Sequence, residues 1–261
     1  MTDQNNSNLA NTFTLPTKGL LYEEGAKRFP NGEITVSSMT TREEKVITGG
    51  GGRSSAKLDT IIERCCDLKG MSATDMTSED RAFLLVMIRV MSYGPKYRYE
   101  VKCPTCGRKS MHNVDLGGEE LQVKYIDDIM DADQLVEPFE FTLPVSKKKV
   151  GWRFLRGSDE SAIDRAGEQI ARAEVEIGDP RYVYRIARHI VEIDGEKKQA
   201  REIMGWVEKM LAKDSMAFRH EVDRLSPGIE FMVDVECPFA DCGDTSRLAM
   251  PMQVEFFRPS A

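Results

Sequence analysis

Two cysteine-containing turns, far apart in the sequence, place the strongest constraint on how this chain can fold. Each has the form Cys-Pro, a short turn, then Cys-Gly: the first contains Cys103 and Cys106, and the second contains Cys237 and Cys242. Each turn lies between two segments in which apolar and polar residues alternate, as they do in half-buried β-strands. About half of the chain lies between the two turns. A fold that unites the four cysteines must therefore bring the end of the chain back to an early hairpin.

The spacing and the flanking residues favour a zinc site. Four thiolates at about 2.3 Å from one ion satisfy tetrahedral Zn²⁺, and a glycine after the second cysteine suits a tight turn whose amides face sulfur. We predict one Zn²⁺ per chain in a zinc-ribbon-like site formed by two distant β-knuckles. The alternative, two unrelated pairs of buried thiols, leaves the matching prolines and glycines unexplained. The predicted metal ligands are Cys103, Cys106, Cys237 and Cys242.

Such a site leaves no coordination position for water or substrate, so the predicted metal is structural rather than catalytic. The N-terminus lacks the apolar stretch of an export signal, and six cysteines are too few for a small secreted disulfide scaffold. Cys65 and Cys66 are expected to be buried as small apolar side chains. His112 is an alternative ligand, but four cysteines already complete the site.

The remaining patterns predict an α+β fold with mixed β-sheet elements and a helical insertion, closed by the four-cysteine site. Common zinc ribbons have about 15–20 residues between their cysteine pairs, so we interpret the much longer segment here as containing an insertion. We expect the following regions: a flexible tail (1–12), an N-terminal arm and helical region (13–96), a β/zinc-ribbon region (97–157 and 226–261) and the helical insertion (158–225).

Local signals set the expected helices and one hairpin. Thr40 and Glu43 have the spacing of a capping box at the start of a short helix. After the glycines at 49–52, apolar residues recur at the spacing of one buried helix face, and a second helix follows from about residue 78 until Gly94-Pro95. The strand-like segments "FEFTLP" and "VGWRFL" are interpreted as a hairpin across "VSKKK".

Charge and motifs exclude several classes of function. The formal net charge is −7 and the sequence pI is about 5.2, so the chain has no overall positive field that would attract phosphates or anionic lipid. No run of 18 apolar residues is present, and we expect a soluble intracellular protein. The sequence contains no nucleophile elbow, Walker loop, H-E-x-x-H motif or dinucleotide fingerprint. We therefore expect neither enzymatic activity nor a nucleic-acid or membrane partner.

The N-terminal part of the chain contains a Leu-Pro-x-x-Gly-Leu-x-Tyr stretch and a Met-Thr-x-x-Glu-Glu stretch. The residues that form them are Leu15, Pro16, Gly19, Leu20, Tyr22, Met39, Thr40, Glu43 and Glu44. These stretches resemble the opening of the baseplate hub protein family of T-even-type contractile-tailed bacteriophages, whose members begin in this way. The resemblance implies a non-catalytic structural or assembly protein, a virion component of the tail baseplate that passes through the host cytoplasm during assembly. It also implies partners among the other baseplate, hub, spike or wedge proteins.

The first of these stretches, "LPTKGLLY", has two interpretations that the sequence leaves open. It can lie extended on a neighbouring subunit, with main-chain hydrogen bonds and apolar anchors, or it can be a strand of the protein's own sheet. For the first interpretation, the candidate partner-binding residues are Leu15, Pro16, Gly19, Leu20, Leu21 and Tyr22.

Three alternative functions also stay open at this point. One is an assembly chaperone of the baseplate hub that is absent from the mature virion. Another is a zinc-ribbon regulator that binds nucleic acid, for which Lys102, Arg108 and Lys109 offer positive charge, although acidic residues around the second knuckle, such as Asp241, offset it. The third, a cell-wall hydrolase, requires a catalytic group that no motif supplies.

Overall fold

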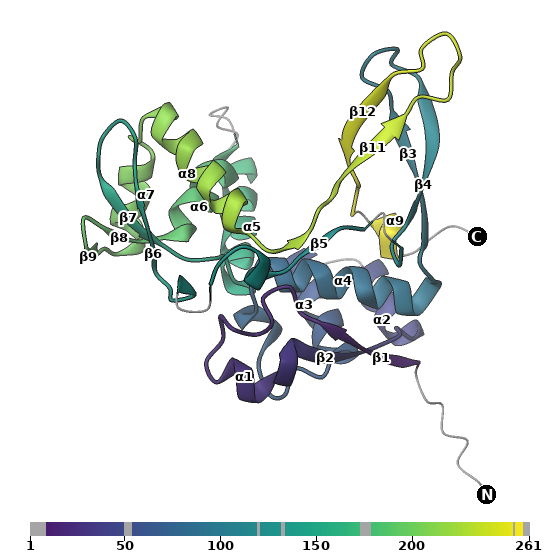
Figure 1. Cartoon of the computed structure of the whole chain (residues 1–261), viewed down its shortest axis with the longest axis horizontal. Coiled ribbons are helices and arrows are strands. Elements are labelled where there is room, and N and C mark those ends of the chain that lie inside the picture. The colour runs from purple at the N-terminus through teal and green to yellow at the C-terminus, as the bar shows by residue number, and fades with distance from the viewer. Residues whose placement is uncertain are drawn as a thin grey trace, which may run out of the picture.

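The computed structural model describes residues 9–49, 54–118, 121–131, 134–172, 179–252 and 254–257. These residues form two bodies, each with its own hydrophobic cluster, and an arm of two β-hairpins that projects from the first body (Figure 1). The combination of helices with small antiparallel sheets confirms the predicted α+β class. No helix in the described ranges is long and apolar enough to cross a membrane.

The first body contains a two-stranded sheet packed against helices. Its central helix α4 follows the all-round apolar pattern of its sequence, and Phe83 to Ile88 are all buried. The predicted capping box is present at α2, and Gly94, with φ +81°, ends α4 as expected. The elements are β1 (Ala10–Thr14), α1 (Gly25–Arg28), the 3-10 turn Pro30–Gly32, β2 (Glu33–Ser37), α2 (Thr41–Thr48), α3 (Ser54–Cys65), the 3-10 turn Ala73–Asp75 and α4 (Ser78–Tyr93).

The arm consists of two antiparallel hairpins whose buried faces meet. In β3 the alternate residues Tyr97, Tyr99 and Val101 are buried, and they pack in the same cluster as Val235 from the other hairpin. The Tyr97 hydroxyl also donates to the carbonyl of Pro251, at 2.9 Å, near the base of the arm. The strands are β3 (Lys96–Lys102), β4 (Lys109–Asp115), β11 (Met232–Glu236) and β12 (Thr245–Ala249), followed by the short helix α9 (Val254–Phe257).

The second body combines three helices with a four-stranded antiparallel sheet of order β6-β7-β8-β9, and a fourth helix, α5, packs on α6 and on the helices of the first body. Three aromatic side chains, Trp152, Phe154 and Phe218, are fully buried in the core of this second body. The ring centroid of Trp152 lies 5.3 Å from that of Phe154 and 6.1 Å from that of Phe218. The predicted hairpin across "VSKKK" is confirmed as β6 paired with β7. The elements are β6 (Phe139–Thr142), β7 (Lys149–Trp152), α5 (Gly157–Arg172), α6 (Pro180–His189), β8 (Ile190–Ile193), β9 (Glu196–Lys197), α7 (Ala200–Val207) and α8 (Ala212–Leu225).

The structure differs from the sequence-based expectation within residues 158–225, which we interpreted as helical throughout. Strands β8 and β9 form a hairpin there, and both turn residues have positive φ, +52° at Asp194 and +77° at Gly195. An Asp-Gly pair after β-branched residues favours this type of turn. Strands β6 and β7, which we had grouped with the ribbon, pack with these helices in the second cluster. The domain boundaries stay a prediction.

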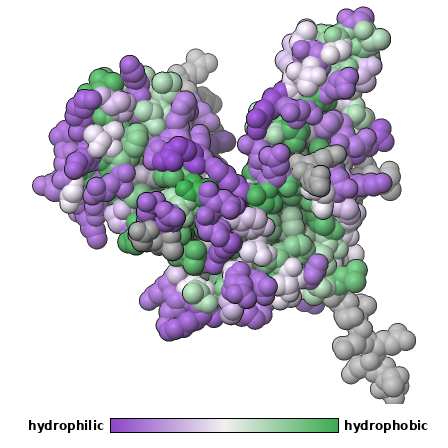
Figure 2. Space-filling model, viewed as in Figure 1, coloured by the Kyte–Doolittle hydropathy of each residue, from purple (hydrophilic) through white to green (hydrophobic). Residues whose placement is uncertain are grey.

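Two chain crossings, one N-terminal segment and the packing of α5 against α3 and α4 connect the bodies. Strand β5 (Val123–Lys124), next to the 3-10 turn Ile126–Asp128, pairs with β10 (Gly228–Ile229), so the outgoing and returning chains are hydrogen-bonded to each other. The amide of Ile126 donates to the carbonyl of Pro16, at 2.9 Å. On the face shown in Figure 2, apolar residues gather near the base of the arm and between the bodies, whereas hydrophilic residues cover much of the arm and of the second body.

Candidate metal centre

The first cysteine knuckle forms the tip of the hairpin β3-β4. Cys103 follows the last residue of β3, and its amide donates to the carbonyl of Arg108, at 2.9 Å. The amide of Gly107 donates back to the carbonyl of Cys103, also at 2.9 Å. Gly107 has φ +70°, a conformation that residues with a Cβ rarely adopt, which explains why glycine follows the second cysteine.

The second knuckle repeats this arrangement at the tip of β11-β12 with a longer turn. The amide of Cys237 donates to the carbonyl of Asp244, at 2.8 Å, and the amide of Gly243 donates to the carbonyl of Phe239, at 3.0 Å. Gly243 has φ +56° and corresponds in position to Gly107. The two additional residues are accommodated within the turn, so both knuckles present two sulfurs from the end of a hairpin.

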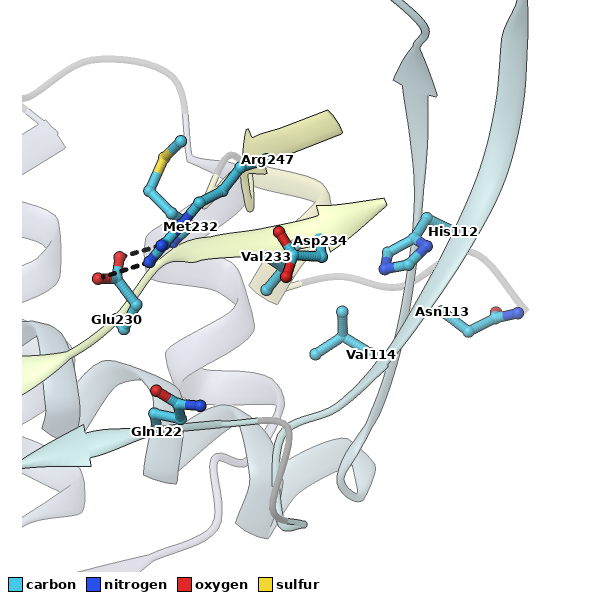
Figure 3. A pocket seen from close by; sticks show the side chains of 9 residues that line it. All are labelled: His112, Asn113, Val114, Gln122, Glu230, Met232, Val233, Asp234 and Arg247. Carbon is cyan, nitrogen blue, oxygen red and sulfur yellow. Dashed lines mark hydrogen bonds and ion pairs between the residues drawn. The ribbon is translucent and has the colours of Figure 1, made fainter. Parts of the chain in front are cut away.

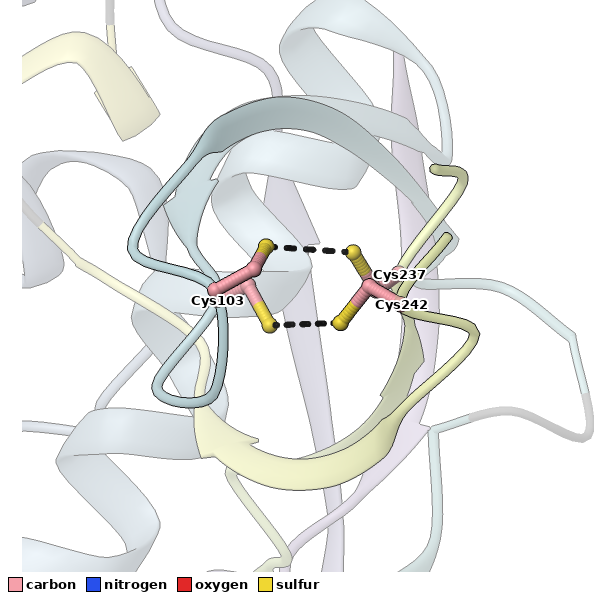
Figure 4. A group of neighbouring side chains, drawn as sticks. Cys103, Cys237 and Cys242 are labelled. Carbon is pink, nitrogen blue, oxygen red and sulfur yellow. Dashed lines mark hydrogen bonds between the residues drawn. The ribbon is translucent and has the colours of Figure 1, made fainter. Parts of the chain in front are cut away.

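The two knuckles bring all four cysteine sulfurs together, as the sequence predicted. The sulfurs lie within 4.8 Å of one another, and two of the approaches between knuckles are 3.9 Å for Cys103 to Cys242 and 3.7 Å for Cys106 to Cys237 (Figure 4). A tetrahedron with about 2.3 Å from metal to sulfur has edges of about 3.8 Å. A disulfide would need about 2.05 Å, and all four cysteines are free thiols.

The chemistry of the donors also fits a closed, sulfur-ligated site. Cys103 and Cys237 are buried, Cys106 and Cys242 are half-buried, and apolar residues of both hairpins, including Val101, line a small cavity directly below them. Sulfur donors select soft or borderline ions such as Zn²⁺ over Mg²⁺ and Ca²⁺. With four protein ligands, an ion here has no open position, so it would stabilise the arm and would not bind a substrate.

The electrostatic environment differs between the knuckles. The Nε of Arg108 donates to Cys106 Sγ, at 3.4 Å, and this hydrogen bond is the main reason that the pKa of the Cys106 thiol is lowered to about 6. At Cys237 a backbone hydrogen bond from Phe239 lowers the pKa, but burial and the neighbouring thiols together raise it to about 12. Because the thiolate is the metal ligand, binding of an ion releases protons from the cysteines that are protonated at the working pH.

Polar contacts across the two knuckles are a part of the site that sequence reasoning missed. The guanidinium of Arg108 donates to Asp241, at 2.7 Å, and lies over the Phe239 ring, 4.0 Å from its centroid. The hydroxyl of Thr105 donates to Asp244, at 2.8 Å. The sequence placed opposite charges at the two knuckles, but it gave no indication that Arg108 reaches both a sulfur and the other turn.

His112, the alternative ligand, lies away from the sulfurs. Its ring meets the ring of Tyr99 edge-on, with centroids 5.5 Å apart, and it lines a cavity of about 380 Å³ between the hairpins. In Figure 3, His112 and Val114 lie on one side of this cavity and Asp234 on the other. Among the described residues, the group of side chains that could hold a metal ion contains the four cysteines and no histidine.

The segment "LPTKGLLY" lies at the junction of the two bodies and packs within its own chain. Leu15 is fully buried, and Thr17 and Tyr22 donate to the buried carboxylate of Asp80 on α4. Leu21 contacts the second cluster, and its carbonyl accepts from Arg156 at 3.3 Å. Pro16 and Gly19 are also buried, whereas Leu20 keeps 41% of its surface exposed. Most of the candidate partner-binding residues are thus buried or make contacts within their own chain.

Comparison with known proteins agrees with the resemblance of the N-terminal residues. No curated protein and no solved structure matches the chain. The model of the family described as "T4 bacteriophage base plate protein" matches residues 22–258, which include the Met39–Glu44 stretch, both cysteine knuckles, the second body and the first body without β1. Because the match covers nearly the whole sequence, this chain belongs to the T4 bacteriophage base plate protein family.

Proposed function

We propose that this chain is a non-catalytic structural component of the hub region in the baseplate of a contractile phage tail. Family membership supports the baseplate role and an association with other tail proteins. The hub position rests on the resemblance of residues 15–22 and 39–44. The proposed partners are hub, spike or wedge proteins, met first in the host cytoplasm and then retained in the virion.

We further propose that Cys103, Cys106, Cys237 and Cys242 hold one structural Zn²⁺. The observation that carries this proposal is the sulfur geometry, with cross-knuckle distances of 3.7 and 3.9 Å that match the edges of a tetrahedral site. The ion would join an early hairpin to a late one and close the tip of a projecting arm. The end of the arm consists of two turns from separate hairpins, and a metal is a physically reasonable way to hold such an end together.

The exposed part of the N-terminal segment is a proposed partner contact. Leu20 is the most solvent-exposed residue of "LPTKGLLY", whereas Leu15 and Gly19 are buried. A partner that packs on this segment would therefore reach Leu20 first. Leu20→Asp tests this contact, since it leaves the buried residues in place and adds a charge where an apolar partner would sit.

The experiment that tests the function is quantitative mass spectrometry of purified phage particles beside assembly intermediates. We expect the protein in mature particles, in a fixed ratio to other baseplate proteins. Its presence in intermediates alone would replace the virion-component proposal with the assembly-chaperone alternative. Absence from both preparations would contradict a baseplate role altogether.

The ion pairs of the first knuckle argue against the nucleic-acid alternative. Arg108 is paired with Asp241, and Lys109 with Glu100 at 2.7 Å, so two of the three cations considered for phosphate binding have acidic partners. A gel-shift titration with duplex DNA over a range of salt concentrations tests it. We expect no shift; retarded DNA whose binding falls steeply with salt would support the alternative.

A further inference from the structure

We infer that Arg108 is the residue that positions the metal centre, by holding the second knuckle against the first and by compensating the charge on sulfur. The inference rests on the zinc site proposed above. It assigns a role to a side chain that is not a ligand and that stands outside the four-cysteine pattern.

The contacts of Arg108 span both knuckles. From its own turn, its Nε donates to Cys106 Sγ, at 3.4 Å. Toward the other turn, its Nη2 donates to Asp241 Oδ1, at 2.7 Å, and its guanidinium plane lies over Phe239, 4.0 Å from the ring centroid. One rigid, planar group thus links a ligand sulfur of one hairpin to the loop between Cys237 and Cys242 of the other.

This geometry suits arginine and no other side chain. A guanidinium offers several donors in a fixed fork and also stacks on aromatic faces, whereas a lysine offers one point charge on a flexible stem. Hydrogen bonds from outside the ligand set orient the ligands, and loss of such a partner typically weakens metal binding about 10- to 100-fold. We expect a similar loss here, because Arg108 touches a ligand and also holds the loop of two others.

The charge of the site gives a second reason to expect that Arg108 favours metal binding. One Zn²⁺ with four thiolates carries a net charge of about −2, and a cation beside one of the sulfurs reduces the cost of forming that charge. Cys106 is the sulfur that receives the donated hydrogen bond. Arg108 therefore acts on the bound state as well as on the position of the loops.

A neighbouring residue provides a matched control. Thr105, also in the first knuckle, donates to Asp244 of the second knuckle at 2.8 Å, but it has no hydrogen bond to a sulfur. Thr105→Val removes one polar contact across the knuckles and leaves the surroundings of Cys106 unchanged. It separates the positioning of the sulfurs from a general weakening of the tip.

The experiment measures Zn²⁺ affinity of the full-length protein by competition with a chromophoric chelator. We expect Arg108→Ala to weaken binding about 10- to 100-fold, Arg108→Lys to lose less because it keeps the charge, and Thr105→Val to stay within about threefold of wild type. Asp241→Asn serves as a second variant that leaves Arg108 in place. Asp241 and Arg108 act through the same contact. We therefore expect the double variant, Asp241→Asn with Arg108→Ala, to bind Zn²⁺ as tightly as Arg108→Ala alone.

Thermal unfolding with excess chelator measures the stability of the metal-free protein. A residue that only stabilised the tip would change this melting temperature. We expect Arg108→Ala and Thr105→Val to change this metal-free melting temperature by similar small amounts, although their Zn²⁺ affinities differ. Equal affinities for the two variants, or an Arg108→Ala affinity equal to wild type, would overturn the inference. A wild-type protein that binds no Zn²⁺ would instead refute the metal part of the proposed function, so the two failures are distinguishable.

Discussion

The tip of the arm and the junction between the bodies both join segments that are distant in the sequence, but they do so with different chemistry. The tip unites four thiols across a separation of 131 positions between Cys106 and Cys237. At the junction, the fully buried carboxylate of Asp80 accepts hydrogen bonds from Thr17 and Tyr22. The four thiols are suited to a metal ion, whereas the carboxylate of Asp80 already has hydrogen-bond donors from the protein. We therefore expect the tip to respond to loss of a cysteine and the junction to respond to loss of the carboxylate.

The difference follows from the surroundings of each site. The knuckles lie at the far end of the projecting arm, away from both bodies (Figure 1). The junction lies between two hydrophobic clusters and contains fully buried side chains such as Leu15 and Thr77. In the first case we propose that metal coordination holds the segments together, whereas in the second a hydrophobic core encloses a hydrogen-bonded carboxylate.

The largest expected effect is that of breaking the tip. Cys103→Ser removes one ligand, and we expect loss of the bound metal together with several kcal/mol of arm stability, because a structural zinc contributes on the order of 10 kcal/mol in small metal-dependent domains. Hydrogen exchange should then show fast exchange in β3, β4, β11 and β12 and unchanged protection in α4. Cys65→Ala serves as a control that keeps the metal. Equal loss of protection in α4 would contradict the separation of tip and junction.

The next effect is that of breaking the junction. Asp80→Ala leaves the amide and hydroxyl of Thr17 and the hydroxyl of Tyr22 without their acceptor. Each buried donor left unsatisfied costs about 1–3 kcal/mol, so we expect a loss of roughly 3 kcal/mol or more in urea unfolding. Asp128→Ala, at an exposed position of the same junction, should change little. Metal content should stay at the wild-type value, and its loss would show that the two sites are coupled.

A smaller effect tests the hydroxyl of Tyr22 in that network. Tyr22→Phe removes the hydroxyl that donates to Asp80, at 2.5 Å, and that also accepts from the buried amide of Thr77, at 3.2 Å. We expect a loss of about 1–2 kcal/mol, and in the Asp80→Ala background the same substitution should cost less, because only the contact with Thr77 is then lost. The double-mutant cycle is read from urea unfolding. Additive losses would mean that the hydroxyl and the carboxylate do not interact.

A last effect is a dependence of the free energy of unfolding on pH, which arises near the junction. Burial is the main reason that the pKa of Glu79, next to Asp80 on α4, is raised to about 8. A carboxyl whose pKa is higher in the folded state contributes stability that is complete below its unfolded value and is lost as pH rises through about 8. We therefore expect the free energy of unfolding to fall between about pH 5 and pH 8, and to fall less steeply in Glu79→Gln. Identical slopes in the two proteins would refute this assignment.

The predictable features are those encoded by local spacing. The two Cys-Pro and Cys-Gly turns identified the four sulfurs, and the apolar period identified helices α3 and α4. The hairpin β8-β9 was missed even though Asp194-Gly195 is a turn signal, because strongly helical segments surround it. In that case a local signal was outweighed by its neighbours.

Contacts between distant side chains were outside the reach of sequence reasoning. Thr17 meets Asp80 across 63 positions, and Arg108 meets Asp241 across 133. Nothing in the composition of "LPTKGLLY" distinguishes a segment that lies on a partner from one that closes a junction in its own chain. Only the packing shows that Leu15 and Tyr22 point inward here and that Leu20 keeps an exposed surface.

The most direct test of the account is the metal content of the purified wild-type protein, measured by elemental analysis beside the mass of the intact native chain. The account predicts one zinc per chain, lost in both Cys103→Ser and Cys242→Ser, with a lower melting temperature in each variant. A wild-type chain free of metal, or a Cys103→Ser and Cys242→Ser double variant as stable as the wild type, would contradict the proposal that a metal closes the arm.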